Sequence, residues 1–184
     1  LSYMPSPIYV DPQSVHTPTV GGFPPASWAN LVRGDLEHLV RPPMTIGRFD
    51  EASPLTVPDT TITAVPFEET DAHDTDGMHS PSSNPTRFTC ATGLGGWYYC
   101  EGQVQYETDP ALEGTSLEMW YRVNGSTAYL VDQRIGLDKR TVMIGSYTVQ
   151  LAAGDYVEVI LGHQAGADLS IISGSFQLRK VSAL

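Results

Sequence analysis

The chain has 184 residues, which is enough for one sizeable hydrophobic core. Its 17 glycines and 14 prolines, beside only 17% charged residues, are typical of a chain with many turns and few long helices, so an all-β domain is favoured over a helical bundle. The formal net charge of -11 would repel phosphate backbones, and we therefore expect no nucleic-acid partner.

No stretch of about 20 apolar residues occurs, so membrane insertion is not expected. The N-terminus has no basic segment followed by an apolar one, which gives no support for export by the usual signal. The two cysteines, Cys90 and Cys100, lack the spacing of a redox or zinc motif, and we expect two free thiols. Free thiols agree with folding in a cytoplasm.

Residues 1–44 are predicted to form an extended arm and one short helix. Residues 1–22 contain four prolines and no apolar period, as an extended arm would. Ser27 suits a helix cap, and Arg41-Pro42-Pro43 would end the helix. This predicted anchor helix has an apolar stripe formed by Trp28, Val32, Leu36 and Leu39. A helix of this length is not stable alone in water. Its apolar stripe must therefore pack either on the rest of its own chain or on the same helix of sister chains.

Residues 45–184 are predicted to form one β-rich head. Strands are expected at Gly96–Tyr106 and at Leu117–Val123, and we expect these two to be partners. Asn124-Gly125 is the strongest hairpin signal, because this dipeptide suits a type I′ turn. From Ser146 to Lys180 apolar and polar residues alternate around a Gly-Asp turn. Short strands at near-regular spacing, separated by turns, predict a sandwich or jelly roll.

Residues 68–85 are polar and predict a long loop of the kind that often carries function. Acidic residues and two histidines lie close together there, and carboxylates suit calcium whereas imidazoles suit transition metals. The spacing does not fit an EF-hand. Asp74 and Asp76 are therefore candidates for a metal, but a solvated loop is the favoured interpretation, and we expect no cofactor.

Catalytic motifs were sought and none was found. There is no Gly-x-Ser-x-Gly elbow, and among the many acidic residues no pair stands out as a glycosidase pair. His163 is in step with the inward-facing apolar row of its strand, which favours a hydrogen-bonded core residue over a catalytic base. Packing at a subunit axis is a second structural interpretation of His163. We expect no enzyme.

Three aromatic residues, Trp97, Tyr99 and Trp120, should point away from the core if the alternation holds. Exposed aromatic rings can stack on sugars or fill a subunit interface, and the interface is the favoured interpretation. The sugar interpretation stays open as the alternative.

The order of several short motifs resembles the C1q/TNF-like jelly roll found in virion proteins of phages that infect actinobacteria. The motifs run from about Thr45 to the C-terminus: Phe67, Asp76-Gly77-Met78-His79, Arg87-Phe88-Thr89, Gly96-Trp97-Tyr98, Arg122-Val123-Asn124-Gly125, the Ala-Gly-Asp-Tyr-Val-Glu-Val run from Ala153, and a closing Ser-Phe-x-Leu strand. The segment from Trp28 through Pro43 also resembles the N-terminal segment of many small phage virion proteins. In the family, the Asp-Gly-Met-His segment is a structural crossover.

The resemblance implies a compact homotrimer with apolar and aromatic side chains along its axis. It therefore implies a trimer interface that includes Trp97, Tyr99, Trp120, Tyr147, Tyr156 and His163. We expect a non-enzymatic virion structural protein, made in the host cytoplasm and exposed on the virion surface, which other virion proteins hold through residues 1–44. Among virion roles, a minor tail or host-adhesion protein is favoured, and a capsid decoration or head-fibre protein is the alternative. A carbohydrate-binding module is a further alternative. A host cell-surface glycan is a possible binding partner.

Overall fold

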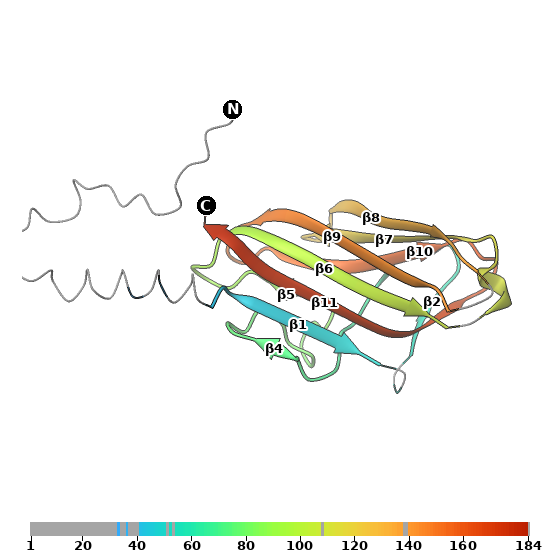
Figure 1. The fold of residues 1–184 in the computed structure, drawn as a ribbon, viewed down its shortest axis with the longest axis horizontal. Helices are drawn as coiled ribbons and strands as arrows, with labels where there is room; N and C mark the ends of the chain where they lie inside the picture. The colour runs from blue at the N-terminus through green and yellow to red at the C-terminus, as the bar shows by residue number, and fades with distance from the viewer. Residues whose placement is uncertain are drawn as a thin grey trace, which may run out of the picture.

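A computed structural model describes residues 33, 36, 41–50, 52, 54–107, 109–137 and 140–183. Almost all of the regular structure in these residues is β, arranged as two antiparallel sheets stacked face to face (Figure 1). No helix in the described part of the chain is long and apolar enough to cross a bilayer. Of the predicted anchor helix, Trp28, Val32 and Leu39 lie outside the described residues. Leu36 is described; it has helical backbone and an exposed side chain.

Sheet A forms the front layer in Figure 1. Its strands, in spatial order, are β4 (His73–Asp74), β1 (Met44–Phe49), β11 (Leu169–Ala183), β6 (Gly96–Tyr106) and β9 (Val142–Leu151), and β2 (Leu55–Val57) pairs with the start of β11. The long central pair of β6 and β11 holds the sheet together, because the two strands are paired along the whole of β6, with one register shift near each end.

Sheet B lies behind sheet A and contains the remaining strands. Its spatial order is β3 (Thr63–Ala64), β10 (Tyr156–His163), β7 (Ser116–Val123) and β8 (Thr127–Ile135), and β5 (Phe88–Thr89) pairs with the start of β10. One 3-10 turn, η1 (Pro110–Leu112), precedes β7, and the Asp109 carboxylate caps it by accepting a hydrogen bond from the Ala111 N–H. The all-β jelly-roll sandwich expected from the sequence is confirmed.

The chain passes from one sheet to the other at most of its turns, and this corrects two predictions. β7 is not the partner of β6, since β6 pairs with β11 and β9 in sheet A whereas β7 pairs with β10 and β8 in sheet B. The turn at Gly154 does not close a hairpin either, because it leads from β9 in sheet A to β10 in sheet B. The alternation of apolar and polar residues in a strand is the same whether the next strand along the chain lies in the same sheet or in the opposite one. Alternation alone therefore does not predict which strands pair.

The turn between β7 and β8 is the one predicted hairpin that forms as expected. Asn124 and Gly125 both have positive φ, at 50° and 69°, which is the combination that a type I′ turn requires. The Asn124 side chain has a role of its own. Its amide donates a hydrogen bond to the Asp155 carboxylate at 2.8 Å, and its oxygen accepts one from the Tyr156 N–H at 3.0 Å. This residue therefore joins the β7–β8 turn to the turn that precedes β10.

The core between the sheets is rich in aromatic rings. The Phe176 ring of β11 meets the rings of Phe88 and Tyr121 edge to face, with centroids 4.6 and 5.2 Å apart. Gly102 makes room for this cluster, because a Cβ there would lie 3.0 Å from the Phe176 ring. Cys90 and Cys100 are buried in the same core as free thiols, as the sequence predicts.

Candidate oligomer interface

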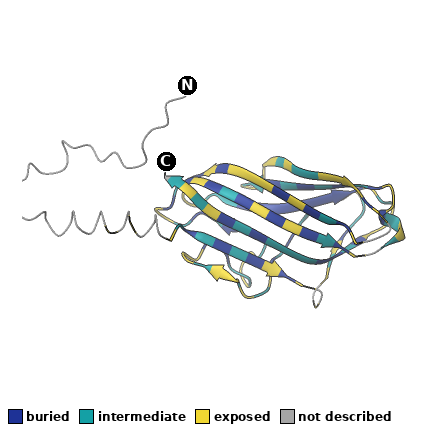
Figure 2. Ribbon diagram, viewed as in Figure 1, coloured by how far each residue is buried: buried dark blue, intermediate teal, exposed yellow. Residues whose placement is uncertain are grey.

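The outer face of sheet A is formed by every second residue of its strands. Figure 2 shows how buried and exposed residues alternate along these strands. On β6 the buried residues include Tyr98, Cys100 and Val104, whereas Trp97 and Tyr99 point outward. Trp97 is 43% exposed, which is a large exposed fraction for a tryptophan in a central strand. The prediction that these two rings point away from the core is confirmed.

Neighbouring strands supply the groups that surround the two rings. Trp97 lies opposite Gln150 of β9, and Tyr99 lies between Thr148 of β9 and Arg179 of β11. The Arg179 guanidinium is 5.8 Å from the centre of the Tyr99 ring, within the range of a cation–π contact. This end of the outer face therefore combines two aromatic rings with one cation.

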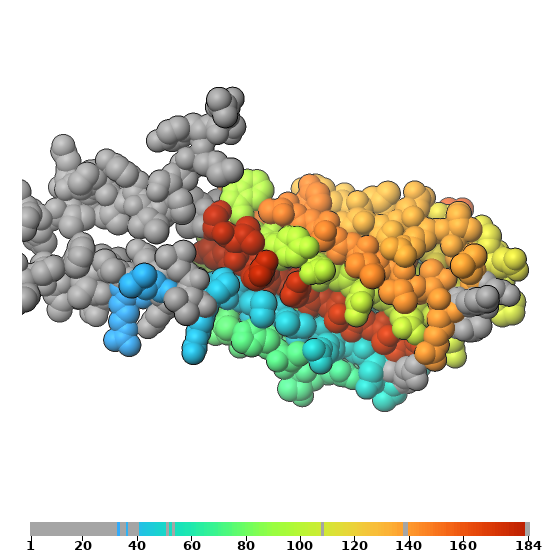
Figure 3. Space-filling model, in the orientation of Figure 1, coloured from blue at the N-terminus to red at the C-terminus, as the bar shows by residue number. Residues whose placement is uncertain are grey.

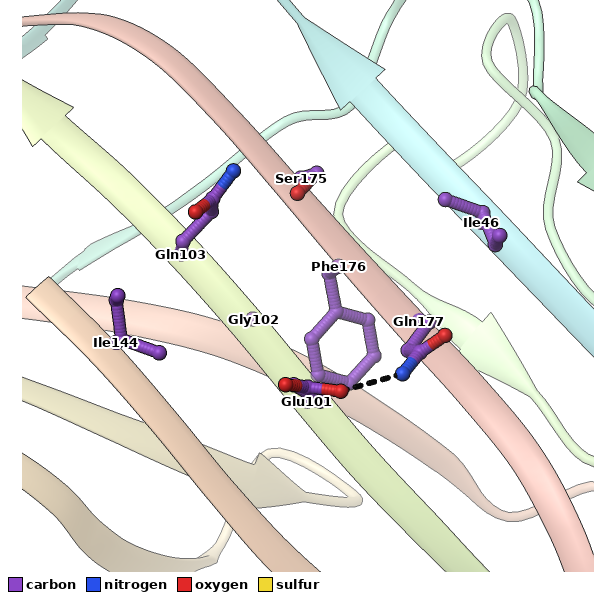
Figure 4. A pocket seen from close by; sticks show the side chains of 8 residues that line it. All are labelled: Ile46, Glu101, Gly102, Gln103, Ile144, Ser175, Phe176 and Gln177. Atoms are coloured by element: carbon purple, nitrogen blue, oxygen red, sulfur yellow. Dashed lines mark hydrogen bonds between the residues drawn. The ribbon is translucent and has the colours of Figure 1, made fainter.

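The middle of the outer face is hollowed, as the close view in Figure 4 shows. The hollow has a volume of about 270 Å³, and the Gln177 amide donates to the Glu101 carboxylate across its floor at 2.6 Å. Ile46 of β1 and Ile144 of β9 stand on its two sides. Figure 3 shows how β1, β11, β6 and β9 together form this continuous surface, viewed face on.

A second aromatic feature lies at the open side of the sandwich, between the edge strands β8 and β9. Tyr129 of β8 and Tyr147 of β9 stack with ring centroids 4.4 Å apart and an angle of 22° between their planes. Tyr147 belongs to the inward row of β9, the edge strand of sheet A, and it remains 37% exposed. The stacked pair adjoins the outer face of sheet A along β9.

Two further residues of the predicted interface lie on the opposite side of the molecule. Trp120 lies on the outer face of sheet B, where its cross-strand neighbours are Ile160 and Leu130. Tyr156 lies at the start of β10 with the Arg87 guanidinium 4.3 Å above its ring. The structure therefore does not bring Trp120 and Tyr156 together with Trp97 and Tyr99, and the predicted set does not form one surface.

The side chain of His163 points into the sandwich. Its Nε2 lies 2.8 Å from the Val57 carbonyl, and its Nδ1 lies 3.3 Å from the Ala165 N–H, which donates to it. Its side chain is fully buried. The favoured interpretation, a hydrogen-bonded core histidine, is confirmed, and the placement of His163 in a subunit interface is wrong.

The two candidate metal ligands have structural tasks in the turn after β4. The Asp74 carboxylate accepts hydrogen bonds from the backbone N–H groups of Met78 at 3.0 Å and His79 at 3.3 Å. Asp76 accepts a hydrogen bond from the Thr75 hydroxyl. Within the described residues, no three His, Cys, Asp or Glu side chains are grouped so that they could hold a metal ion.

Several residues of the outer face were not among the predicted interface residues. Ile46, Ile144 and Arg179 all alternate with buried neighbours, so their outward direction is readable from the sequence. What the sequence did not reveal is that β1, β9 and β11 lie beside β6. Their membership in one surface follows only from the strand order.

No protein-family model and no curated protein sequence matches the chain. Solved structures do match. The globular domain of zebrafish complement 1qA protein has a TM-score of 0.55 and 16% sequence identity, and the match covers 77% of this chain and 99% of that one. PRD1 vertex protein P5 has a TM-score of 0.56 and 14% identity, with coverage of 76% and 97%. Murine APRIL has a TM-score of 0.50 and 13% identity, with coverage of 74% and 98%. At these identities the likeness establishes the fold, which is the C1q/TNF-like jelly roll.

Proposed function

We propose that this chain is a non-enzymatic structural protein of a virion, assembled as a homotrimer and exposed on the particle surface. The observation that carries the proposal is the likeness of the sandwich to PRD1 vertex protein P5 over 97% of that chain. The resemblance of the sequence to virion proteins of actinobacteria-infecting phages points in the same direction. Synthesis in the host cytoplasm agrees with the two buried free thiols.

The outer face of sheet A is the proposed contact surface of the trimer. Trp97 and Ile144 are large apolar side chains that remain about half exposed there, and burial against another copy would remove this area from water. A closed ring of three copies needs two different surfaces on each copy, because its contacts are head to tail. The edge that carries the Tyr129–Tyr147 stack supplies a second surface next to the first.

Residues 1–44 are proposed to attach the head to the rest of the particle. Leu36 has helical backbone, and 55% of its surface remains exposed. Sister helices or another virion protein would cover the stripe that Leu36 shares with Trp28, Val32 and Leu39. The head, residues 45–184, would then face outward.

Two positions on the particle are proposed. The sequence resemblance fits both positions, and we favour a minor tail or host-adhesion protein. The likeness to a vertex protein favours a capsid position, such as a decoration or head-fibre protein. In either position three copies of a weak binding site would give an avidity that one copy lacks.

The proposal can be tested by separating purified virus particles into a head fraction and a tail fraction and probing each fraction for this chain. We expect an antibody against this chain to detect it in one of the two fractions, and the fraction assigns the position. A chain that is missing from purified particles would contradict the virion proposal altogether.

A further inference from the structure

A second hollow lies on the outer face of sheet B, on the side of the sandwich opposite the proposed trimer contact. We name it the Trp120 hollow. It has a volume of about 180 Å³ and is lined by Thr60, Thr61, Ile62, Ser116, Glu118, Trp120, Gly162, His163 and Gln164. Because sheet B faces away from sheet A, a trimer closed through sheet A leaves the Trp120 hollow open to solvent.

A glycine lets the side chains of the Trp120 hollow lie close to strand β10. Gly162 lies opposite Glu118 in the β10–β7 ladder, with its missing side chain on the outer face. A Cβ at this position would lie 2.8 Å from Ile62 Cδ1 and 3.1 Å from Trp120 Cζ3. The indole ring and Ile62 therefore both pack against the backbone of Gly162, and these two side chains form the apolar part of the hollow.

The rim of the Trp120 hollow is polar and partly fixed in place. The Gln133 amide donates to the Glu118 carboxylate at 3.0 Å and to the Ser116 hydroxyl at 3.2 Å, which orients both groups on the β7 side. A carboxylate can accept about four hydrogen bonds, so Glu118 keeps acceptor capacity for a ligand. On the β10 side, Gln164 contributes an exposed amide with donors and an acceptor.

This combination matches one neutral sugar ring. A pyranose has an apolar face of C–H groups that can lie on an indole ring, and an edge of hydroxyl groups that both donate and accept hydrogen bonds. Small-ligand sites have the same build: apolar walls with a few polar groups that fix the orientation. Charge decides which sugars fit, because the chain carries -11 overall, Glu118 lies on the rim, and no Lys or Arg lines the hollow. Sialic acid, uronic acids and phosphates would be repelled.

We propose that the Trp120 hollow binds a neutral hexopyranose unit of a glycan. As a host-surface site it rests on the proposed virion function, but as a sugar site it stands on the geometry alone. Trp120 supplies the stacking surface, Glu118 and Gln164 supply the hydrogen bonds, and Gly162 lets the indole ring lie close to β10. One sugar ring in so open a site is expected to bind with a Kd on the order of 1–10 mM, which three copies would strengthen.

The full chain has only three tryptophans, so fluorine NMR of 5-fluorotryptophan protein gives one signal for each. Trp→Phe variants at 28, 97 and 120 assign the three signals. The probes are the methyl glycosides of glucose, galactose and mannose, each added to about 100 mM. We expect a saturable shift of the Trp120 signal with at least one probe, and no shift of the Trp97 signal, which reports on the opposite face.

Gly162→Ala is the decisive variant, because the new methyl group would push the Trp120 ring and Ile62 out of their positions in the hollow. The atoms nearest to the new methyl group belong to Ile62 and to the Trp120 ring, which lie on the outer face of sheet B and can move outward, so the fold is expected to survive. We expect sugar binding to weaken at least about tenfold. Trp97→Phe is the matched control and is expected to bind as the parent chain does.

The inference would be overturned if no probe shifts the Trp120 signal, or if the shift is the same in Gly162→Ala as in the parent chain. It would also be overturned if Gly162→Ala lowers the mass of the assembly, because this face would then be a contact between copies. The mass of the same samples tests the trimer separately. A monomer that still binds sugar would contradict the proposed trimer and support the sugar site. A trimer that binds none of the three sugars would support the trimer and contradict the sugar site.

Discussion

Trp97 and Trp120 lie on the outer faces of different sheets, with the whole hydrophobic core between them. One flat contact with another molecule cannot cover both rings. The two sides of the sandwich can therefore have separate roles: the Trp97 side for assembly and the Trp120 side for recognition.

Ile144→Glu is expected to break the trimer. The side chain is 50% exposed in the isolated chain, and a buried, unpaired charge at a subunit contact costs several kcal/mol. Ile62→Glu is the matched control, since Ile62 is 52% exposed but lies on the side of sheet B. Light scattering should give a monomer for the first variant and a trimer for the second. Equal masses for the two variants would contradict the assignment of sheet A as the contact surface.

Arg122→Ala is expected to lower the free energy of unfolding by about 1–3 kcal/mol. Arg122 donates two hydrogen bonds, of 3.0 and 2.8 Å, to the Glu158 carboxylate, which is almost fully buried. Thr86 also donates to this carboxylate and the Arg87 guanidinium lies 3.6 Å from it, so the charge keeps two partners after the substitution. Urea unfolding measures the loss.

Arg134→Ala is the control for that experiment, because Arg134 makes an ion pair of 2.7 Å with Asp132 at the surface. Exposed pairs of this kind contribute about 0–1 kcal/mol. A loss for Arg134→Ala as large as the loss for Arg122→Ala would show that the burial of Glu158 is not the cause.

His79→Ala is expected to destabilise the head by about 2–4 kcal/mol. The His79 ring is buried, its Nδ1 lies 2.6 Å from the Asp71 carboxylate, its Nε2 lies 3.0 Å from the Pro85 carbonyl, and it stacks on Phe88 at 4.2 Å. One side chain thus ties both ends of the 68–85 loop to the core. His73→Ala, which alters an exposed histidine of the same loop, should leave the melting temperature nearly unchanged. Two equal losses would contradict this account of His79.

The free energy of unfolding is expected to fall as the pH rises above about 9. Burial raises the pKa of Cys100 from 9.0 to about 12, so the unfolded chain releases this proton first and is favoured as the pH increases. The slope is about 1.4 kcal/mol for each pH unit between the two pKa values. Below pH 9 both states hold the proton and the slope disappears.

Cys100→Ala isolates that contribution. Burial also raises the pKa values of Tyr98, Tyr106 and Tyr121, but their unfolded pKa of 10.0 makes them act later. Urea unfolding between about pH 8 and about pH 10 should therefore give a shallower slope for Cys100→Ala than for the parent chain. Identical slopes would contradict the assignment to Cys100.

The sequence was informative about single strands and turns. The bounds of β6 and the positive φ values at Asn124 and Gly125 agree with the predictions, because alternation and turn chemistry are local properties. The inward position of His163 followed from the same alternation.

Strand neighbours were harder to predict, because pairing is not local. β7 follows β6 in the chain but lies in the other sheet, and the same is true of β10 and β9. Alternation told us that Trp97 and Trp120 point away from the core, but it did not tell us that they do so on opposite sides. For this reason the predicted interface combined residues from two faces and one from the core.

The mass of the full chain and of a truncated chain that starts at Arg41 tests the central claim most directly. The truncation should begin there because the Pro43 carbonyl, just before β1, accepts a hydrogen bond of 2.8 Å from the Lys180 N–H of β11. Light scattering should give a trimer for both chains if the outer face of sheet A holds the copies together. Monomers in both samples would contradict the trimer, and a trimer only in the full chain would move the contact from sheet A to residues 1–40.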